Sequence, residues 1–259
     1  MHFLKNIIEN KTFFLTTVVV LLIFSSIISY QNISLDLYFN DKYMNYAKSF
    51  SNLLKIKPVK MVNDLSSFPI WGYGIVHWLF NSSKINILIF QQALNFIAIY
   101  LTDKFLSRKY QKTIFIWRIL VLIGFPYFLF HTQIWPKSLS SSLLILAVLQ
   151  LIKYFDDKRK IHLIFSGLFF GLLCNFRSDY IYFILSISIF LIFWEIIEKK
   201  KTTLFSFSTL ILPLITLLFL IPWGLYTKSK TDHYLLTSTN SGHSLFIGLG
   251  QLPNNIWNI

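Results

Sequence analysis

The sequence predicts an all-α polytopic membrane protein, built as one membrane domain with about seven transmembrane helices. Two properties of the chain predict this class. Hydrophobic residues make up 54% of its 259 residues and charged residues only 14%, against roughly 25% charged in an ordinary soluble domain. The mean hydropathy is +0.57, a value that requires lipid as the solvent for apolar surface. A soluble globular protein is therefore excluded.

The first predicted span covers residues 13–30. Its apolar run is longer than the roughly 7 to 15 residues of a signal-peptide core, and no small-residue cleavage site follows it. We therefore expect this span to be retained as a membrane anchor.

Six further apolar runs predict spans. They lie near residues 85–101, 114–130, 139–155, 161–176, 181–197 and 204–226. Within them, Gly167 and Gly171 have the GxxxG spacing that allows close helix approach. Arg118 is expected to reach the membrane interface by snorkelling. Pro213 and Pro222 are expected to kink the last span at its middle and at its outer end.

Basic residues predict the orientation, because Lys and Arg flanking spans are retained on the cytoplasmic side. Segments 1–11, 103–112, 153–160 and 197–203 hold 13 of the 24 Lys and Arg residues in only 36 positions. The N-terminus is therefore predicted to be cytoplasmic. The net charge of +13 fits such loops, so we expect no nucleic-acid partner.

The stretches then expected to face outward are a long loop over 31–84, two short links near His131 and Arg177, and a tail over 227–259. In the loop, apolar residues recur every three or four positions over 39–55, which predicts an amphipathic helix on the membrane surface. Residues 68–80 are apolar but too short to span the bilayer, and predict a half-helix leading into the second span.

Two carboxylates of the outer loop, Asp41 and Asp36, are candidates for a general base at the bilayer surface. Partial desolvation by lipid raises a carboxylate pKa, whereas nearby cations lower it, and such a group can accept a proton from a hydroxyl or amine. The alternative for Asp41 is a helix cap, because a carboxylate is favoured at a helix N-terminus.

Three cationic or ionisable side chains on the same side are candidates for binding an anionic headgroup. The guanidinium of Arg177 could hold a phosphate with paired donors, and His131 and Lys137 could add further donors. The alternatives are snorkelling for Arg177, a structural role for His131 and solvation for Lys137. Motifs for nucleotides and metals are absent. An outer carboxylate could ligate a divalent ion, but without a second ligand we predict no metal and no cofactor.

Four segments carry a resemblance to a known family: DLYFNDKYMNYAKSF (36–50), SSFPIWGYGIVHWLF (66–80), GLFFGLLCNFRSDY (167–180) and IPWGLYTKSKTDHYLLTSTNSGHSLFIGLG (221–250). Through these four segments and their order, the chain resembles the C-type membrane glycosyltransferases that use polyprenyl-phosphate sugars. The likeness is greatest to the family of protein O-mannosyltransferases and lipid A aminoarabinose transferases. Ser178 and Asp179 stand where that family has Pro and Glu.

The resemblance implies roles for particular residues. Asp41, and Asp36 after it, would act as the catalytic base or orient the acceptor. Arg177 would contact the donor phosphate, and Tyr46, which matches a tyrosine of the family pattern, would contact substrate. Members of the family generally continue through more spans into a further outer domain, so we expect the C-terminal part of that architecture to be missing here.

The predicted function is therefore transfer of a sugar from a polyprenyl-phosphate donor to a protein or to an envelope glycan or lipid, on the outer face of a bacterial inner membrane. Membrane lipid and the lipid-linked sugar are the expected partners. One alternative is a non-enzymatic carrier or flippase for a lipid-linked saccharide, ranked lower because the middles of the spans are nearly free of charge. The other is a truncated partner that helps a full-length transferase to assemble.

Overall fold

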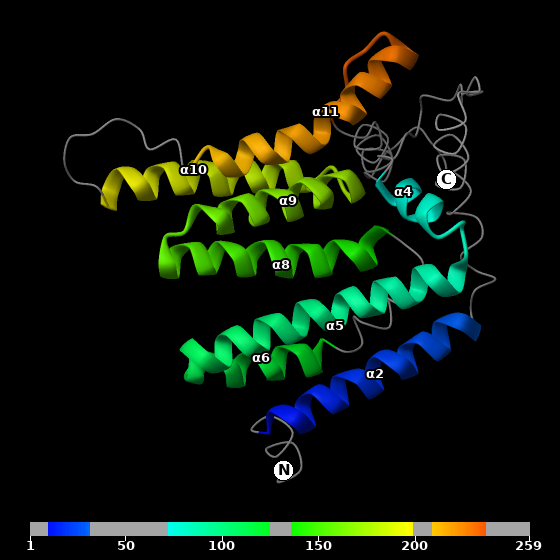
Figure 1. The fold of residues 1–259 in the computed structure, drawn as a ribbon, viewed down its shortest axis with the longest axis vertical. Coiled ribbons are helices and arrows are strands. Elements are labelled where there is room, and N and C mark those ends of the chain that lie inside the picture. Colours follow the sequence, from blue (N-terminus) through cyan, green and yellow to red (C-terminus); the bar gives the residue numbers. More distant parts are fainter. Residues whose placement is uncertain (1–9, 32–71, 125–135, 199–208, 237–259) are drawn as a thin grey trace, which may run out of the picture.

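A computed structural model describes residues 10–31, 72–124, 136–198 and 209–236. These four stretches are helical and contain no strand (Figure 1). The eight helices are α2 (Lys11–Gln31), α4 (Gly72–Leu79), α5 (Lys84–Lys109), α6 (Gln111–Ile123), α8 (Pro136–Asp157), α9 (Lys160–Phe176), α10 (Tyr180–Glu198) and α11 (Ile211–Thr231).

Five of these helices are long and apolar enough to cross a membrane: α2, α5, α8, α10 and α11. Their length and composition confirm the predicted class of helical, multi-pass membrane protein. Helix α9 is apolar but has 17 residues, and α6 has 13, so the count of seven spans stays a prediction.

The helix bounds correct two details of the last predicted span. Helix α11 begins at Ile211 and continues to Thr231, so it includes the first residues of the predicted outer tail. Pro213 lies in the first turn, where a missing backbone N–H breaks no helical hydrogen bond. It therefore cannot kink the middle of the span, whereas Pro222 does lie inside the helix.

Residues 68–80 were predicted to form a half-helix, and the structure confirms it over α4. Four residues, 80–83, form the turn that separates α4 from the start of α5. The predicted amphipathic helix over 39–55 lies outside the described residues.

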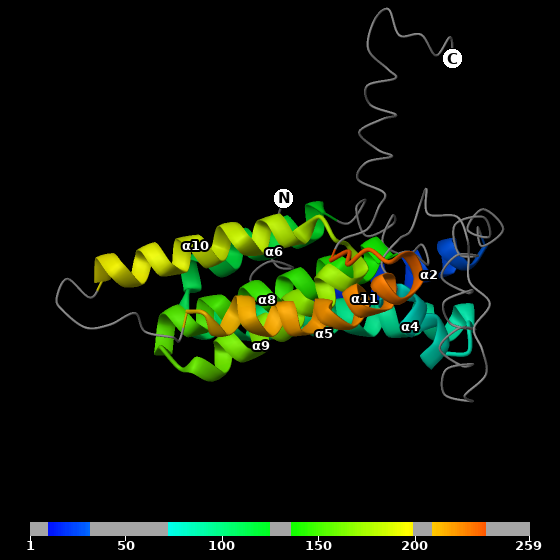
Figure 2. The same ribbon diagram turned by 90° about the horizontal axis from the view of Figure 1, so that it is seen from above.

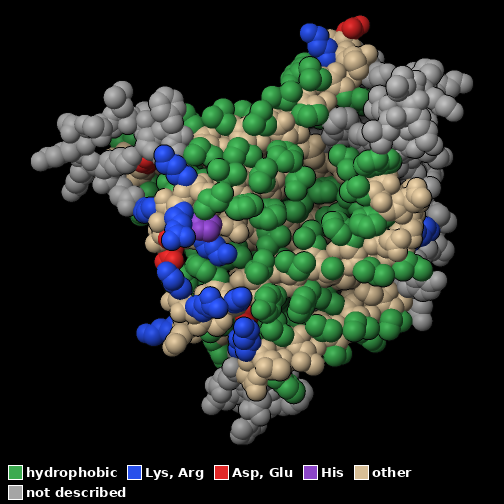
Figure 3. All heavy atoms as spheres, viewed as in Figure 1, with side chains coloured by type: hydrophobic (Ala, Val, Ile, Leu, Met, Phe, Trp, Pro, Cys, Tyr) green, Lys and Arg blue, Asp and Glu red, His purple; other side chains and the backbone are tan. Residues whose placement is uncertain are grey.

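Apart from the short α4, the helices reverse direction from one to the next along the chain, whereas the spatial neighbours α5 and α8 run parallel, as do α9 and α11 (Figure 1). Helices α2, α5, α8, α9 and α11 form one layer in which each contacts the next (Figure 1). Helices α6 and α10 lie on one side of that layer (Figure 2). Exposed apolar side chains cover much of the surface, as expected where lipid replaces water (Figure 3).

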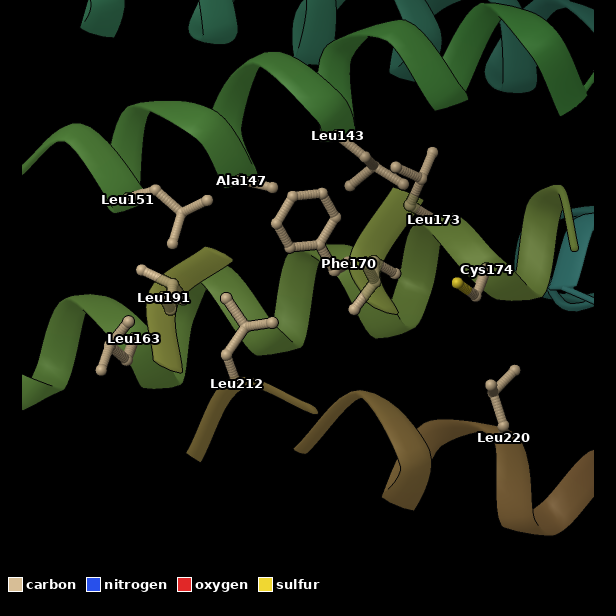
Figure 4. Packing of buried hydrophobic residues seen from close by; sticks show 11 residues of the cluster. Leu143, Ala147, Leu151, Leu163, Phe170, Leu173, Cys174, Leu191, Leu212 and Leu220 are labelled. Carbon is tan, nitrogen blue, oxygen red and sulfur yellow. The ribbon is translucent and has the colours of Figure 1, made fainter. Parts of the chain in front are cut away.

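The main core lies between α8, α9 and α11, where fully buried side chains such as Leu163, Phe170 and Leu212 meet (Figure 4). Helix α11 approaches α9 at the predicted small residues. A Cβ on Gly167 would lie 3.0 Å from the Cβ of Ile215, and one on Gly171 would lie 2.8 Å from the Cβ of Phe219. The GxxxG spacing therefore does serve close helix packing.

The alternating helices bring most of the described basic residues to one end of the bundle, here called the basic end (Figure 3). Its members are Lys11, Lys104, Arg108, Lys109, Lys112, Lys153, Lys158, Arg159 and Lys160. The opposite end, here called the α4 end, carries α4 and the α9–α10 connection.

Candidate functional site

Helix α4 is held tightly against the last turn of α9. A Cβ on Gly72 would lie only 2.6 Å from the carbonyl carbon of Asn175, so only glycine allows this approach. The Asn175 side chain donates hydrogen bonds to the carbonyl oxygens of Gly171, at 2.9 Å, and Phe219, at 3.0 Å. Helices α4, α9 and α11 are thereby joined at the α4 end.

Two aromatic residues of α4 face the interior. The Tyr73 hydroxyl accepts a hydrogen bond of 2.7 Å from Nε2 of Gln91 on α5, and the Tyr73 ring meets the edge of His77 with centroids 5.1 Å apart. His77 is 2% exposed, and neither ring nitrogen has a hydrogen-bond partner among the described residues. Burial lowers the pKa of His77 to about 4, so the imidazole is neutral at pH 7.

Arg177 follows α9 at the α4 end and forms an ion pair within its own loop. Its Nε donates to Oδ1 of Asp179 at 3.1 Å, and its Nη2 donates to Oδ2 at 2.5 Å. The guanidinium also lies 5.6 Å from the ring centre of Tyr180. The side chain is 36% exposed. Arg177 therefore has a defined orientation at the surface.

Lys137 is the second residue of α8 and is exposed at the same end as Arg177. The structure thus brings these two predicted phosphate ligands to one end of the bundle. Asp36, Asp41, Tyr46 and His131 lie outside the described residues. Within the described part of the chain, no group of three His, Cys, Asp or Glu side chains is arranged to hold a metal ion.

The prediction that Arg118 snorkels to the interface is wrong. The side chain is 4% exposed and forms a two-point ion pair with Asp103 of α5, which is fully buried. Its guanidinium also lies 5.2 Å from the ring centre of Phe14 on α2. The sequence pattern places Asp103 in a loop, because this residue follows the apolar run that ends at Leu101. Helix α5 continues for two turns beyond that run.

Buried polar side chains follow one side of α5 from Tyr73 to this ion pair. Gln91, Asn95, Thr102 and Asp103 are all 8% exposed or less, and Asn95 accepts a hydrogen bond from Ser142 of α8. We call these four residues the polar line of α5. Gln91, Asn95 and Thr102 are polar residues spaced by four and seven positions within an apolar helix. This spacing places them on one side of the helix and is the sequence signal that would have revealed them.

No family model, curated protein or solved structure matches this chain.

Proposed function

We propose that the chain is a membrane glycosyltransferase that moves a sugar from a polyprenyl-phosphate donor to an acceptor, with the α4 end on the outer side of a bacterial inner membrane. The observation that carries the proposal is the placement of Arg177, whose partly exposed guanidinium is oriented by Asp179 and Tyr180. The sequence resemblance assigns this arginine to the donor phosphate.

The exposed ion pair with Asp179 does not prevent that role. Exposed salt bridges contribute only about 0–1 kcal/mol, and the donor phosphate, a diester with one negative charge and two free oxygens, can accept the same paired hydrogen bonds from the guanidinium. The polyprenyl phosphate that leaves is a monoester and carries more negative charge. In the proposal, the donor phosphate therefore replaces the Asp179 carboxylate as the main partner of Arg177. Lys137, exposed at the same end, adds positive charge.

The proposed transfer inverts the configuration at the anomeric carbon of the sugar. An acceptor hydroxyl or amine forms a bond to the anomeric carbon, the bond from that carbon to the phosphate oxygen breaks with its electron pair, and polyprenyl phosphate leaves. The carboxylate of Asp41, or of Asp36, takes the acceptor proton. Arg177 stabilises the negative charge that develops on the departing phosphate.

Photocrosslinking of the purified chain tests the donor site. The probe is a photoactivatable polyprenyl-phosphate sugar analogue, with unlabelled donor as competitor. Competed labelling should be lost in Arg177→Ala and should persist in Lys228→Ala, which removes an exposed cation of α11 at the same end. Asp179→Asn should keep or strengthen labelling, because it removes the competing carboxylate. Equal labelling of wild type and Arg177→Ala would contradict the proposal.

A transfer assay tests the catalytic assignment separately. Asp36→Asn combined with Asp41→Asn should retain donor labelling but abolish sugar transfer, because the proton acceptor is lost while the phosphate site stays. Unchanged turnover in the double variant would overturn the role of these carboxylates.

A second candidate function is a carrier for a lipid-linked saccharide, favoured by the polar line of α5. The carrier was ranked lower because the spans carried little charge in their middles, but Asp103 and Arg118 are ionisable side chains buried between helices, and such residues mark transport paths in membrane proteins. Movement of a fluorescent lipid-linked saccharide across sealed vesicles, without consumption of the donor, would favour the carrier. Donor consumption without movement would favour the transferase.

A further inference from the structure

The basic end has a large excess of positive charge. Of its nine cations, Lys109 pairs with Asp156 at 2.5 Å and Arg159 lies 3.7 Å from Asp157. Lys11 and Lys104 have no carboxylate within ion-pair distance in the described part of the chain. An end with this excess attracts anionic groups in the lipid leaflet that surrounds it.

Lys11 and Lys104 meet at one aromatic ring although they belong to different helices. The Lys11 Nζ lies 5.5 Å from the ring centre of Tyr100, and the Lys104 Nζ lies 5.9 Å from the same centre. Tyr100 also stacks on Phe96 of its own helix. The crossing of α2 and α5 therefore places two ammonium groups around a fixed ring.

Exposed apolar side chains lie beside these cations. On α5, Phe90 and Ile97 lie seven residues apart on the side of the helix that carries Lys104, and they are 36% and 45% exposed. A pair of cations above such a surface matches an anionic phosphate above acyl chains.

We propose that Lys11, Tyr100 and Lys104 form a binding site for the phosphate of an anionic phospholipid of the surrounding bilayer, whose acyl chains lie along the exposed face of α5. The two ammonium groups bind the phosphate oxygens by charge-assisted hydrogen bonds. The site lies at the basic end and is independent of the proposed donor site at the α4 end.

Native mass spectrometry of the full chain in detergent tests the site, with phosphatidylglycerol as the probe. Lys11→Gln with Lys104→Gln removes two charge-assisted hydrogen bonds to the phosphate, so it should weaken binding of the first lipid on the order of 100-fold. The matched control is Arg108→Gln with Lys112→Gln, which removes the same charge from exposed positions of the basic end. The control should weaken that binding far less.

Two further measurements distinguish a specific lipid site from general electrostatic attraction to the basic end. Tyr100→Leu keeps both lysines and should still weaken phosphatidylglycerol binding, because the ring that positions them is lost. Phosphatidylcholine, which has no net charge, and inorganic phosphate, which has no acyl chains, should not compete. The proposal would be overturned if the Lys11/Lys104 and Arg108/Lys112 double variants lost phosphatidylglycerol binding equally. Full competition by inorganic phosphate would overturn it too.

Discussion

Asp103 and Arg118 form the most completely buried ion pair in the described part of the chain. Arg118 Nε donates to Oδ1 of Asp103 at 2.7 Å, and Nη2 donates to Oδ2 at 3.2 Å. The Phe14 ring lies 5.2 Å from the guanidinium carbon. One ion pair therefore connects three helices, α2, α5 and α6.

Asp103→Asn should destabilise the protein by about 3–5 kcal/mol, because it leaves the Arg118 charge buried without its partner. The measurement is the unfolding midpoint of the detergent-solubilised protein. As a control, Asp103→Leu with Arg118→Met removes both charges and should recover most of the loss. If the double variant is as unstable as Asp103→Asn, packing around Asp103 matters rather than the ion pair.

Gly72→Ala should separate α4 from α9, because its new methyl group would collide with the backbone of Asn175. Overpacking of this kind costs about 1–3 kcal/mol. Gly124→Ala is the comparison, since its methyl group would approach only carbonyl oxygens of the preceding helix α6, those of Leu120 at 3.0 Å and Val121 at 3.7 Å. Thermal unfolding should show the larger loss for Gly72→Ala, and equal losses would argue against close α4 docking.

Protonation of His77 should favour unfolding. The pKa of His77 falls from its ordinary value of 6.5 to about 4 in the folded protein, so between those values the unfolded chain binds a proton that the folded chain does not. The stability contributed by neutral His77 is full above pH 6.5 and declines as the pH falls toward 4, by at most about 3 kcal/mol.

The unfolding midpoint of wild type and of His77→Phe, measured from pH 7 to pH 4, checks this dependence. Other groups titrate in both proteins, so the difference between the two curves isolates His77. A difference that stays constant over this range would contradict the lowered pKa.

Ser142→Ala should weaken the contact between α5 and α8, because Asn95 loses the hydroxyl that donates to its Oδ1. The expected destabilisation is about 0.5–2 kcal/mol. Ser141→Ala is the matched control, since that hydroxyl donates within its own helix to the Ser138 carbonyl at 3.1 Å. Detergent unfolding curves should separate the two variants, and a loss confined to Ser141→Ala would exclude the proposed role of the Asn95–Ser142 pair.

The candidate site was predictable to different degrees. Arg177 and Lys137 were placed at the same end from the charge pattern alone, because the alternation of long apolar helices dictates which loops share a side. The ion pair of Arg177 with Asp179 was not predicted, although the two residues are separated by a single position. The backbone turn between α9 and α10 decides whether such neighbours meet, and composition carries no information about that turn.

The sequence by itself determined the class of protein, the presence of a short helix within residues 68–80, and the glycines at the α9–α11 contact. These follow from local quantities: the apolar content of each segment, its length and the spacing of small residues. Only the tertiary structure decided that Arg118 is buried against Asp103, that Lys11 and Lys104 share the Tyr100 ring, and that α5 carries a polar line. Each depends on how separate helices cross. A charged or polar side chain is stable in an apolar interior only where the crossing helix supplies its partner.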